Sequence, residues 1–165
     1  MRLDTTHPDL YLETLVPADT EDLFNAIRAN SGHLSPFMNG HVDFMTSRDN
    51  VLRFIVGNSS FESFGIWQNP QKEADTKILC GQMTVYHTIR STSEIGYWVD
   101  ESKTRQGIAS LAVSCVCDYL KDIGKNVTAK VAPNNHASIA VLRRNGFYQE
   151  MPGALDKNGH LQFQL

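Results

Sequence analysis

The sequence is poor in cysteine, and its three cysteines make neither a closed disulfide set nor a metal site. Cys115 and Cys117 lie two residues apart in one predicted helix, and Cys80 stands alone. No further grouping of cysteine and histidine completes the ligand set of a zinc site. We therefore expect three buried, reduced thiols and no bound metal.

Long apolar runs and an excess of positive charge are also missing. Apolar stretches are short and interrupted, as at Val51–Val56, whereas a membrane-spanning helix needs about 20 residues. Residues 1–8 lack the apolar run of a signal peptide, so we expect a cytoplasmic protein. Fifteen Lys and Arg against eighteen Asp and Glu give a net charge of -3, a poor fit to a protein that grips nucleic acid phosphates. Neither nucleic acid nor a membrane is an expected partner.

What the chain does contain is enough apolar sequence for one core. Its 165 residues are 41% hydrophobic and 20% charged, which argues against disorder and coiled coil. We find no internal repeat and no linker long enough to divide the chain. The sequence therefore predicts a single domain over residues 1–165, as a monomer or a homodimer.

Hydrophobic periodicity predicts a mixed α/β (α+β) fold. The first part reads as a strand at 10–16, a turn and cap at 17–20, a helix that stops near 30–32, a short apolar stretch at 34–38, and a helix at 47–56. The middle reads as strands at 61–68, 78–86 and 94–99, with a turn at 69–72 between the first two. The last part reads as a long amphipathic helix from Gly107, a strand at 127–131, a helix that ends at Gly146, and final strands. Antiparallel strands followed by strand–helix–strand units indicate a mixed sheet.

The loop before the long helix has the character of an anion site. Thr104-Arg105-Gln106-Gly107-Ile108-Ala109 lies between a strand and a helix, whose first amides have no partners within the helix. Such a terminus suits a diphosphate, because Gly107 lets phosphates approach the backbone and Arg105 adds a charge. The loop matches neither a P-loop nor a GxGxxG pattern. The alternative is an ordinary turn in which Gly107 only satisfies the backbone.

A second helix start carries Asn135 and Ser138 on one face of its first turn. In the simpler interpretation this pair only caps the helix. In the other, Asn135 binds an amide-rich cofactor while Ser138 points into a cleft. His136 is interpreted as a surface residue, since nothing acidic stands beside it in the sequence.

Three segments in register carry a family resemblance. They are Glu94-Ile95-Gly96-Tyr97-Trp98-Val99-Asp100-Glu101, the helix start Gly107-Ile108-Ala109, and Asn135-xx-Ser138-xx-Val141-Leu142-xx-Asn145-Gly146-Phe147. Together they resemble the GNAT superfamily of acetyl-CoA-dependent N-acetyltransferases, and within it the ribosomal-protein N-terminal acetyltransferases. The resemblance implies a mixed, mostly antiparallel central sheet flanked by helices. It also implies acetyl transfer to a primary amine, most simply the α-amine of a protein N-terminus.

The resemblance further implies where coenzyme A binds. Loop 104–109, with Thr104, Arg105, Gln106, Gly107, Ile108 and Ala109, would hold the pyrophosphate through backbone amides. The strand end at Trp98 and Val99 would lie along the pantetheine arm and polarise the thioester carbonyl through a main-chain N–H. Asn135 would contact the cofactor, and Ser138 would lie near the thioester sulfur. The chain departs from the family pattern at two positions. Thr104 stands where the family usually has Gln or Arg, and Leu142 stands where many members carry a Tyr that acts as the general acid. Because Leu142 cannot donate a proton, the role of general acid moves to Ser138.

The choice of acceptor decides how strong a base the reaction needs. An α-amine is about one-seventh neutral at pH 7, whereas a lysine amine is neutral about once in 2,500, a gap of roughly 3.5 kcal/mol. An N-terminal substrate therefore tolerates a weak or water-mediated base. The candidates are Glu94 on the strand facing the cleft, and Asp156 and Glu150 in the C-terminal segment. The alternative is that all three are structural or solvated.

The acceptor side is defined less sharply. Tyr86, Tyr97 and Trp98 are candidate pocket residues, although alternation along a strand predicts that Tyr97 or Trp98 belongs to the core. His33, Phe37, Met38 and His41 lie where a lid would cover the acceptor. A small amine such as a polyamine or an aminoglycoside is an alternative acceptor. A coenzyme A-binding module without turnover is the alternative from another functional class.

Overall fold

The computed structural model describes residues 1–57, 60–70, 76–88 and 91–165, and within them a mixed seven-stranded sheet in the order β1-β2-β3-β4-β5-β6-β7. Neighbouring strands are antiparallel except for β5 and β6, which run parallel. The expected mixed, mostly antiparallel sheet flanked by helices is confirmed. The strands are β1 (Arg2–Asp4), β2 (Leu10–Thr14), β3 (Phe61–Gln68), β4 (Ile78–His87), β5 (Thr92–Val99), β6 (Asn126–Val131) and β7 (Leu161–Gln164). The helices are α1 (Thr20–Ala29), α2 (Ser31–Phe44), α3 (Arg48–Val56), α4 (Ile108–Asp122) and α5 (His136–Arg144).

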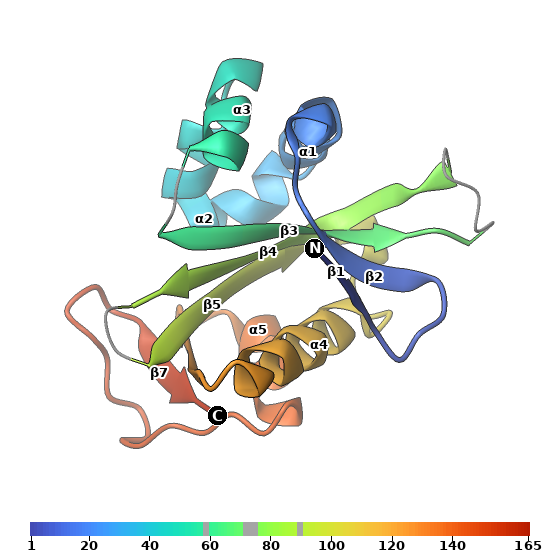
Figure 1. Cartoon of the computed structure of the whole chain (residues 1–165). Helices are drawn as coiled ribbons and strands as arrows, with labels where there is room; N and C mark the ends of the chain where they lie inside the picture. Colours follow the sequence, from blue (N-terminus) through green and yellow to red (C-terminus); the bar gives the residue numbers. More distant parts are fainter. Residues whose placement is uncertain (58–59, 71–75, 89–90) are drawn as a thin grey trace.

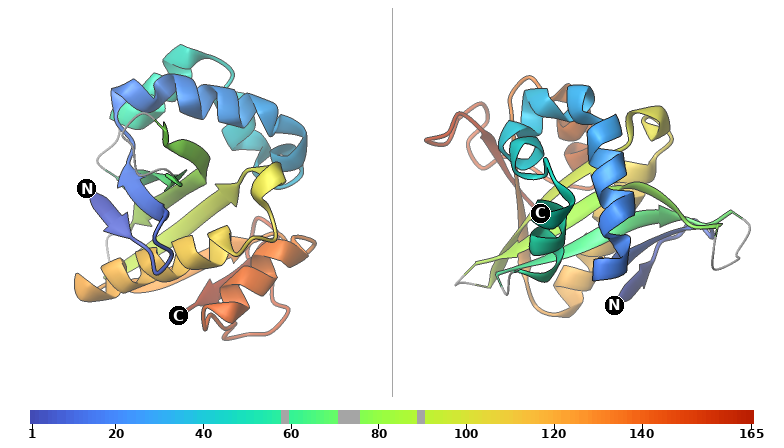
Figure 2. Two further views of the ribbon diagram at one scale, coloured as in Figure 1. Left: turned by 90° about the vertical axis from the view of Figure 1, so that its right-hand side faces the viewer. Right: turned by 90° about the horizontal axis from the view of Figure 1, so that it is seen from above.

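Helices cover the sheet on both faces. Figure 1 shows α1, α2 and α3 on one side and α4 and α5 on the other, and the two views of Figure 2 show the same division. Each face has its own apolar cluster, because alternate residues of a strand point in opposite directions. On β5, Ile95 and Val99 belong to the cluster under α4, whereas Trp98 belongs to the cluster under α1–α3. The expectation that Tyr97 or Trp98 is core is confirmed for Trp98, which is 4% exposed.

Most helices and strands lie at the residues that hydrophobic periodicity predicts. Residues 34–38, which were expected as a short apolar stretch, are instead part of a helix. They belong to α2, which contains Pro36 and is kinked at Met38, with φ −136° and ψ 34°. The proline interrupts the helical pattern in the sequence, since it removes a backbone donor. Packing stabilises the helix despite the proline, because Leu34 near the start of α2 and Met45 directly after its end are buried in the apolar cluster under α1–α3. In the predicted turn at 69–72, Gln71 and Lys72 lie outside the described residues.

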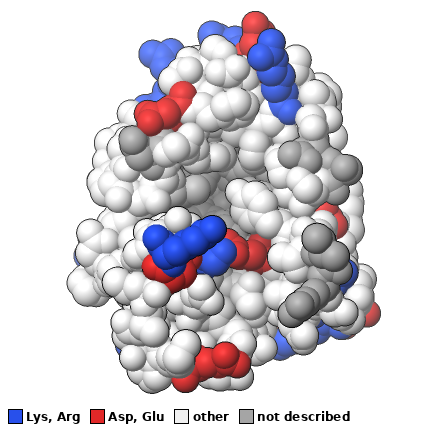
Figure 3. All heavy atoms as spheres, turned by 90° about the vertical axis from the view of Figure 1, so that its left-hand side faces the viewer, with Lys and Arg blue, Asp and Glu red and all other residues white. Residues whose placement is uncertain are grey.

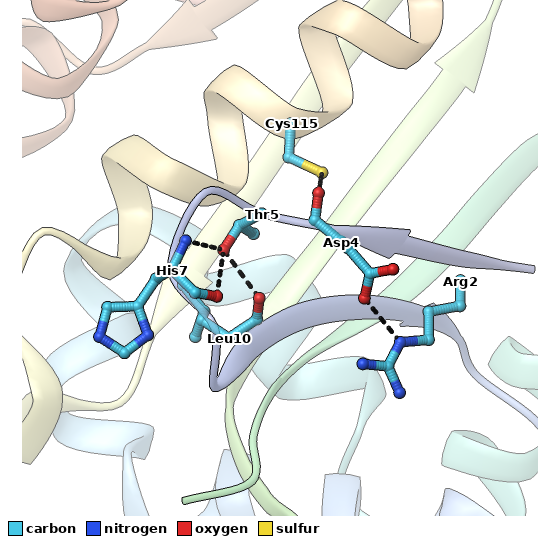
Figure 4. A network of polar contacts seen from close by, with 6 residues as sticks. All are labelled: Arg2, Asp4, Thr5, His7, Leu10 and Cys115. Atoms are coloured by element: carbon cyan, nitrogen blue, oxygen red, sulfur yellow. Dashed lines mark hydrogen bonds and ion pairs between the residues drawn. The ribbon is translucent and has the colours of Figure 1, made fainter.

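The N-terminal strand β1, which was not predicted, adds an edge to the sheet. Figure 4 shows how the turn that follows it is closed by Thr5, whose hydroxyl donates to the carbonyl of Leu10 at 2.7 Å and accepts from the backbone N–H of His7 at 3.1 Å. The thiol of Cys115 on α4 contacts the carbonyl of Asp4 at 3.5 Å. A three-residue strand with exposed ends carries too little periodic signal to be found in the sequence.

The described helices are too short or too polar to span a membrane. None in the described parts of the chain has both the length and the apolar character needed to cross a bilayer.

Gly81 on β4 allows the close approach that sets the end of β5. Its register partner is Val99, and a Cβ at position 81 would lie 2.2 Å from the backbone oxygen of Trp98. We expect Gly81→Ala to destabilise the fold by roughly 1–3 kcal/mol, because backbone atoms must move to make room. Thermal unfolding should show a melting temperature lower by several degrees. Gly32→Ala on α2, where a Cβ meets no atom within 4 Å, is the control and should not lower it. An unchanged melting temperature for Gly81→Ala would contradict the assigned register.

Candidate active site

The site begins where β5 and β6 separate. Their parallel ladder runs from the pair Thr92–Asn126 to the pair Ile95–Ala129, but β5 continues to Val99 and β6 to Val131. A cleft of about 620 Å³ lies along the separated ends and extends to α2, to the start of α4 and to α5. Backbone groups at the parted edges face this cleft instead of a neighbouring strand, so a ligand can use them as hydrogen-bond partners.

The start of α4 supplies amides to this cleft. Gly107 is the N-cap in the left-handed region, at φ +82°, and as a glycine it supplies no side-chain cap to the first turn. Arg105 also has a positive φ, of 61°, which costs a residue with a side chain about 1–2 kcal/mol. Gly107, Ile108 and Ala109 all line the cleft. The free amides and the helix dipole fit the diphosphate that the sequence predicts here.

Of the other predicted loop residues, Thr104 and Arg105 line the cleft and Gln106 does not. The hydroxyl of Thr104 donates to the carbonyl of Glu101 at 2.8 Å, so this side chain helps to hold the loop. Gln106 is exposed, is not among the residues that line the cleft, and donates to the carbonyl of Ser102 at 3.2 Å. The structure therefore brings Thr104 and Arg105 to the cleft and leaves the side chain of Gln106 beside it.

A buried asparagine, which sequence reasoning missed, anchors this loop. Asn30, at the C-terminal end of α1, accepts from the backbone N–H of Glu101 and donates to the carboxylate of Asp100, both at 2.8 Å. It is 3% exposed. Although partial burial acts against ionisation, hydrogen bonds from Ser102 and Asn30 lower the pKa of Asp100. In the sequence Asn30 is only a helix stop, because its partners lie about 70 residues away.

Helix α5 brings Asn135 and Ser138 to the opposite wall. The side-chain oxygen of Asn135 accepts from the backbone N–H of Ser138 at 3.1 Å, so the capping interpretation is correct, and both residues also line the cleft. The hydroxyl oxygen of Ser138 lies 2.9 Å from that of Tyr97 on β5. Burial raises the pKa of Tyr97 to about 12, against the lowering effect of its bond to Ser138. The phenol thus stays protonated at neutral pH and can donate a hydrogen bond.

Trp98 and Val99 lie along the same cleft. The indole N–H of Trp98 donates at 3.0 Å to Gln82, a fully buried side chain on β4. Leu142 is 1% exposed and lines the cleft as an apolar residue.

The three carboxylates considered as bases line a second, smaller pocket. It measures about 200 Å³ and contains Glu94, Glu150 and Asp156, and it shares Ala129 and Lys130 with the cleft. Glu94 is paired with Lys130 at 2.7 Å, and Glu150 accepts from the side-chain amide of Gln164 at 2.7 Å. The structure thus brings the carboxylates together, each with a partner.

Asp156 organises the turn before β7. Its carboxylate accepts from the backbone N–H groups of Asn158 and His160, both at 2.9 Å, and these bonds, above all that of His160, lower its pKa. The imidazole of His160 lines the cleft with Nδ1 3.8 Å from the same carboxylate oxygen. Sequence reasoning missed His160, because only the turn brings it beside Asp156.

The four predicted lid residues all lie on α2, but they do not all line the cleft. His33, Phe37 and Met38 line the cleft. His41 instead packs on the sheet, with Nε2 3.3 Å from the amide oxygen of Gln82, and burial lowers its pKa. Figure 3 shows a face that is hollowed near its centre, with uncharged residues around most of the hollow and basic and acidic side chains side by side along its lower edge.

Comparisons with known proteins agree with this architecture. The ribosomal-protein-serine acetyltransferase of Escherichia coli is 38% identical over 64 residues, which are 38% of this chain and 36% of that relative, so the match spans about a third of the relative's length. Among solved structures, a ribosomal L7/L12 alpha-N-protein acetyltransferase in complex with coenzyme A has a TM-score of 0.82 at 20% identity, over 99% of this chain and 95% of the other. A microcin C7 self immunity acetyltransferase in complex with acetyl-CoA and AMP has a TM-score of 0.75 at 22% identity, over 96% of this chain and 90% of the other.

A family model described as the acetyltransferase (GNAT) domain matches residues 9–148. Since this match covers most of the sequence, the chain belongs to the GNAT acetyltransferase family.

Proposed function

We propose that this chain transfers an acetyl group from acetyl-CoA to a primary amine, and that the amine is the N-terminal α-amine of a protein such as a ribosomal protein. The observation that carries the proposal is the cleft between β5 and β6, which joins free amides at the start of α4 to the Tyr97–Ser138 pair. A phosphate-binding end and a polar reaction centre in one cleft fit a donor with a charged head and a thioester tail.

Acetyl-CoA fits this cleft through groups of both walls. The amides of Gly107, Ile108 and Ala109, with Arg105 beside them, suit its pyrophosphate. The backbone of Trp98 and Val99 suits the amide-rich pantetheine arm, because that edge of β5 has no strand beside it. Asn135 caps α5 and lines the same wall. The bound donor supplies an activated acetyl carbonyl with a thiolate leaving group.

The residues of the reaction centre lie on both faces of the sheet. Tyr97 and Ser138 are on the face covered by α4 and α5, where a hydroxyl can donate a hydrogen bond to the leaving sulfur. Glu94 shares its side of β5 with Trp98, which faces α1–α3. The parting of β5 and β6 connects the two faces, so an amine can approach from one while the thiol leaves on the other.

An α-amine suits this site because its demand for a base is small. Glu94, Glu150 and Asp156 are each engaged with a partner, and a weak base is sufficient for an amine that is partly neutral at pH 7. The names of the similar proteins point the same way, since the relative from Escherichia coli is called a ribosomal-protein-serine acetyltransferase. A cytoplasmic location and a monomeric or homodimeric state stay predictions.

A small cationic amine is the second candidate acceptor. Three carboxylates line the pocket beside the cleft, and only Glu94 among them is paired with a lysine. This arrangement favours an acceptor with additional positive charge, such as a polyamine.

The first experiment measures which amine is acetylated. We expect mass spectrometry to detect a gain of one acetyl group on peptides with a free N-terminus, and none on the same peptides with a blocked N-terminus and a free lysine. Acetylation of polyamines in preference to every peptide would replace the acceptor we propose. Binding of acetyl-CoA in a calorimeter without any acetylated amine would instead indicate a binding module.

Ser138→Ala should slow turnover while leaving acetyl-CoA binding nearly unchanged. The loss of a hydrogen bond to a charged sulfur costs about 1.5–3 kcal/mol, so we expect kcat to fall roughly 10- to 100-fold. Tyr97→Phe should have a smaller effect, because it removes only the partner of that hydroxyl. Ser114→Ala on the exposed side of α4 is the control. Full activity of Ser138→Ala with every acceptor would remove Ser138 from the mechanism.

Asn30→Ala tests the anchor of the phosphate loop. The substitution leaves the backbone N–H of Glu101 and the carboxylate of Asp100 without their buried partner, at a cost of about 1–3 kcal/mol. We expect the KM for acetyl-CoA to rise about tenfold while kcat changes little, because the loop is displaced and the reaction centre is not. Asn25→Ala, on the exposed side of the same helix, is the matched control. An unchanged KM for Asn30→Ala would mean that the loop does not depend on this anchor.

A further inference from the structure

The groups that line the cleft include few that can accept a proton at neutral pH. Lys103, Arg105, Lys130 and Arg144 carry positive charge, and the hydroxyls of Tyr97 and Ser138 act as donors. Among the described residues of the cleft, this leaves the imidazoles of His33 and His160. Histidine is the side chain that most often serves as a general acid or base in enzymes.

His160 differs from His33 in having a carboxylate beside its ring. Nδ1 of His160 lies 3.8 Å from Oδ1 of Asp156, within the range of an ion pair and longer than a direct hydrogen bond. In the part of the chain that the structure describes, the ion pairs include His160 and do not include His33. A carboxylate near Nδ1 favours the tautomer with hydrogen on Nδ1 and leaves the lone pair of Nε2 available.

The turn fixes the carboxylate of Asp156 and the backbone of His160, whose side chain is 39% exposed. Asp156 accepts from the backbone N–H of His160 and of Asn158, and its side chain is 8% exposed. These bonds keep the carboxylate ionised and prevent it from turning away. His160 directly precedes β7, so its backbone is held by the sheet as well. Such support on rigid elements is what a catalytic group requires.

The carboxylates near the cleft are less suited to the same task. Glu94 is neutralised by Lys130, and Glu150 accepts from Gln164. Oδ1 of Asp156 accepts from the backbone N–H groups of both Asn158 and His160. The bonds to Asp156, above all that of His160, lower its pKa, so its carboxylate is a weaker base than a free one.

We propose that His160 is the general base that removes the proton from the acceptor amine, and that Asp156 is its positioning residue. The amine nitrogen bonds to the acetyl carbon, the carbon–sulfur bond breaks with its electron pair going to sulfur, and the proton from nitrogen passes to Nε2 of His160 and then to solvent. Asp156 stabilises the imidazolium that forms. The inference rests on the proposed acetyl transfer, but it does not depend on which amine is the acceptor.

Other charged groups surround this imidazole and set its response to pH. Asp156 faces it from its own segment, and Lys130 of β6 lines both pockets next to it. Glu94 of β5 is paired with Lys130, while Arg144 of α5 and His33 of α2 line the same cleft. A change in the pH profile therefore has to follow the substitution of His160 itself.

The kinetic test compares His160→Gln with wild type at saturating acetyl-CoA and acceptor. We expect kcat to fall about 10²- to 10³-fold and the acidic limb of its pH profile to disappear, with the dissociation constant of acetyl-CoA within about twofold of wild type. His136→Gln, which removes an exposed histidine at the start of α5, is the matched control and should behave as wild type. A kcat within about threefold of wild type for His160→Gln, with the same acidic limb, would overturn the proposal.

A second measurement is independent of turnover. Nitrogen-15 NMR of the labelled histidines should find neutral His160 with hydrogen on Nδ1, and Asp156→Asn should shift that tautomer toward hydrogen on Nε2. Hydrogen on Nε2 in the wild-type protein would overturn the proposal even if no acceptor is found. If wild type acetylates another amine and no peptide, the proposed acceptor fails, and the comparison of His160→Gln is made with that amine.

Discussion

The separation of β5 and β6 after the pair Ile95–Ala129 is the constraint on which the site depends. A parallel pair that stayed closed would use its own backbone groups and leave no passage between the faces of the sheet. Because the strands part, one wall carries free backbone groups of β5 and the other carries α5 with Ser138. The cleft is thus a property of the topology, and side chains only adapt it to a ligand.

The loop at the start of α4 is held in place by a contact with α1, on the other face of the sheet. Asn30 belongs to α1, on one face of the sheet, and its bonds to Asp100 and Glu101 hold a loop whose helix lies on the opposite face. The buried amide therefore fixes both layers relative to the end of β5. This explains why the loop can keep Arg105 at positive φ, since local strain persists where the surroundings determine the backbone.

Local patterns predicted the strands from β2 onward and most helices, because alternation and helical periodicity act within one segment. Strand β3 was predicted with its observed bounds, and capping was one of the two interpretations offered for Asn135. The sequence was misleading at α2, where Pro36 breaks the pattern and burial of Leu34 and Met45 restores the helix. It was silent on Asn30 and His160, whose partners are brought to them by tertiary structure or by a turn. For the same reason the pairing of Tyr97 with Ser138 could not be read from the chain, although both residues were candidates.

The acidity of the two hydroxyls determines what they can do for the leaving group. Tyr97 has a pKa of about 12, whereas a thiolate such as that of cysteine has a pKa near 8.5, so full transfer of the phenol proton to sulfur is unfavourable by roughly 5 kcal/mol. A serine hydroxyl is a weaker acid than a phenol. The pair therefore stabilises the departing thiolate by hydrogen bonding, and the sulfur is protonated after it leaves. The reaction therefore depends more on a general base that removes the proton from the amine nitrogen than on a general acid that protonates the sulfur. That base has to lie on the side of the sheet from which the acceptor amine approaches.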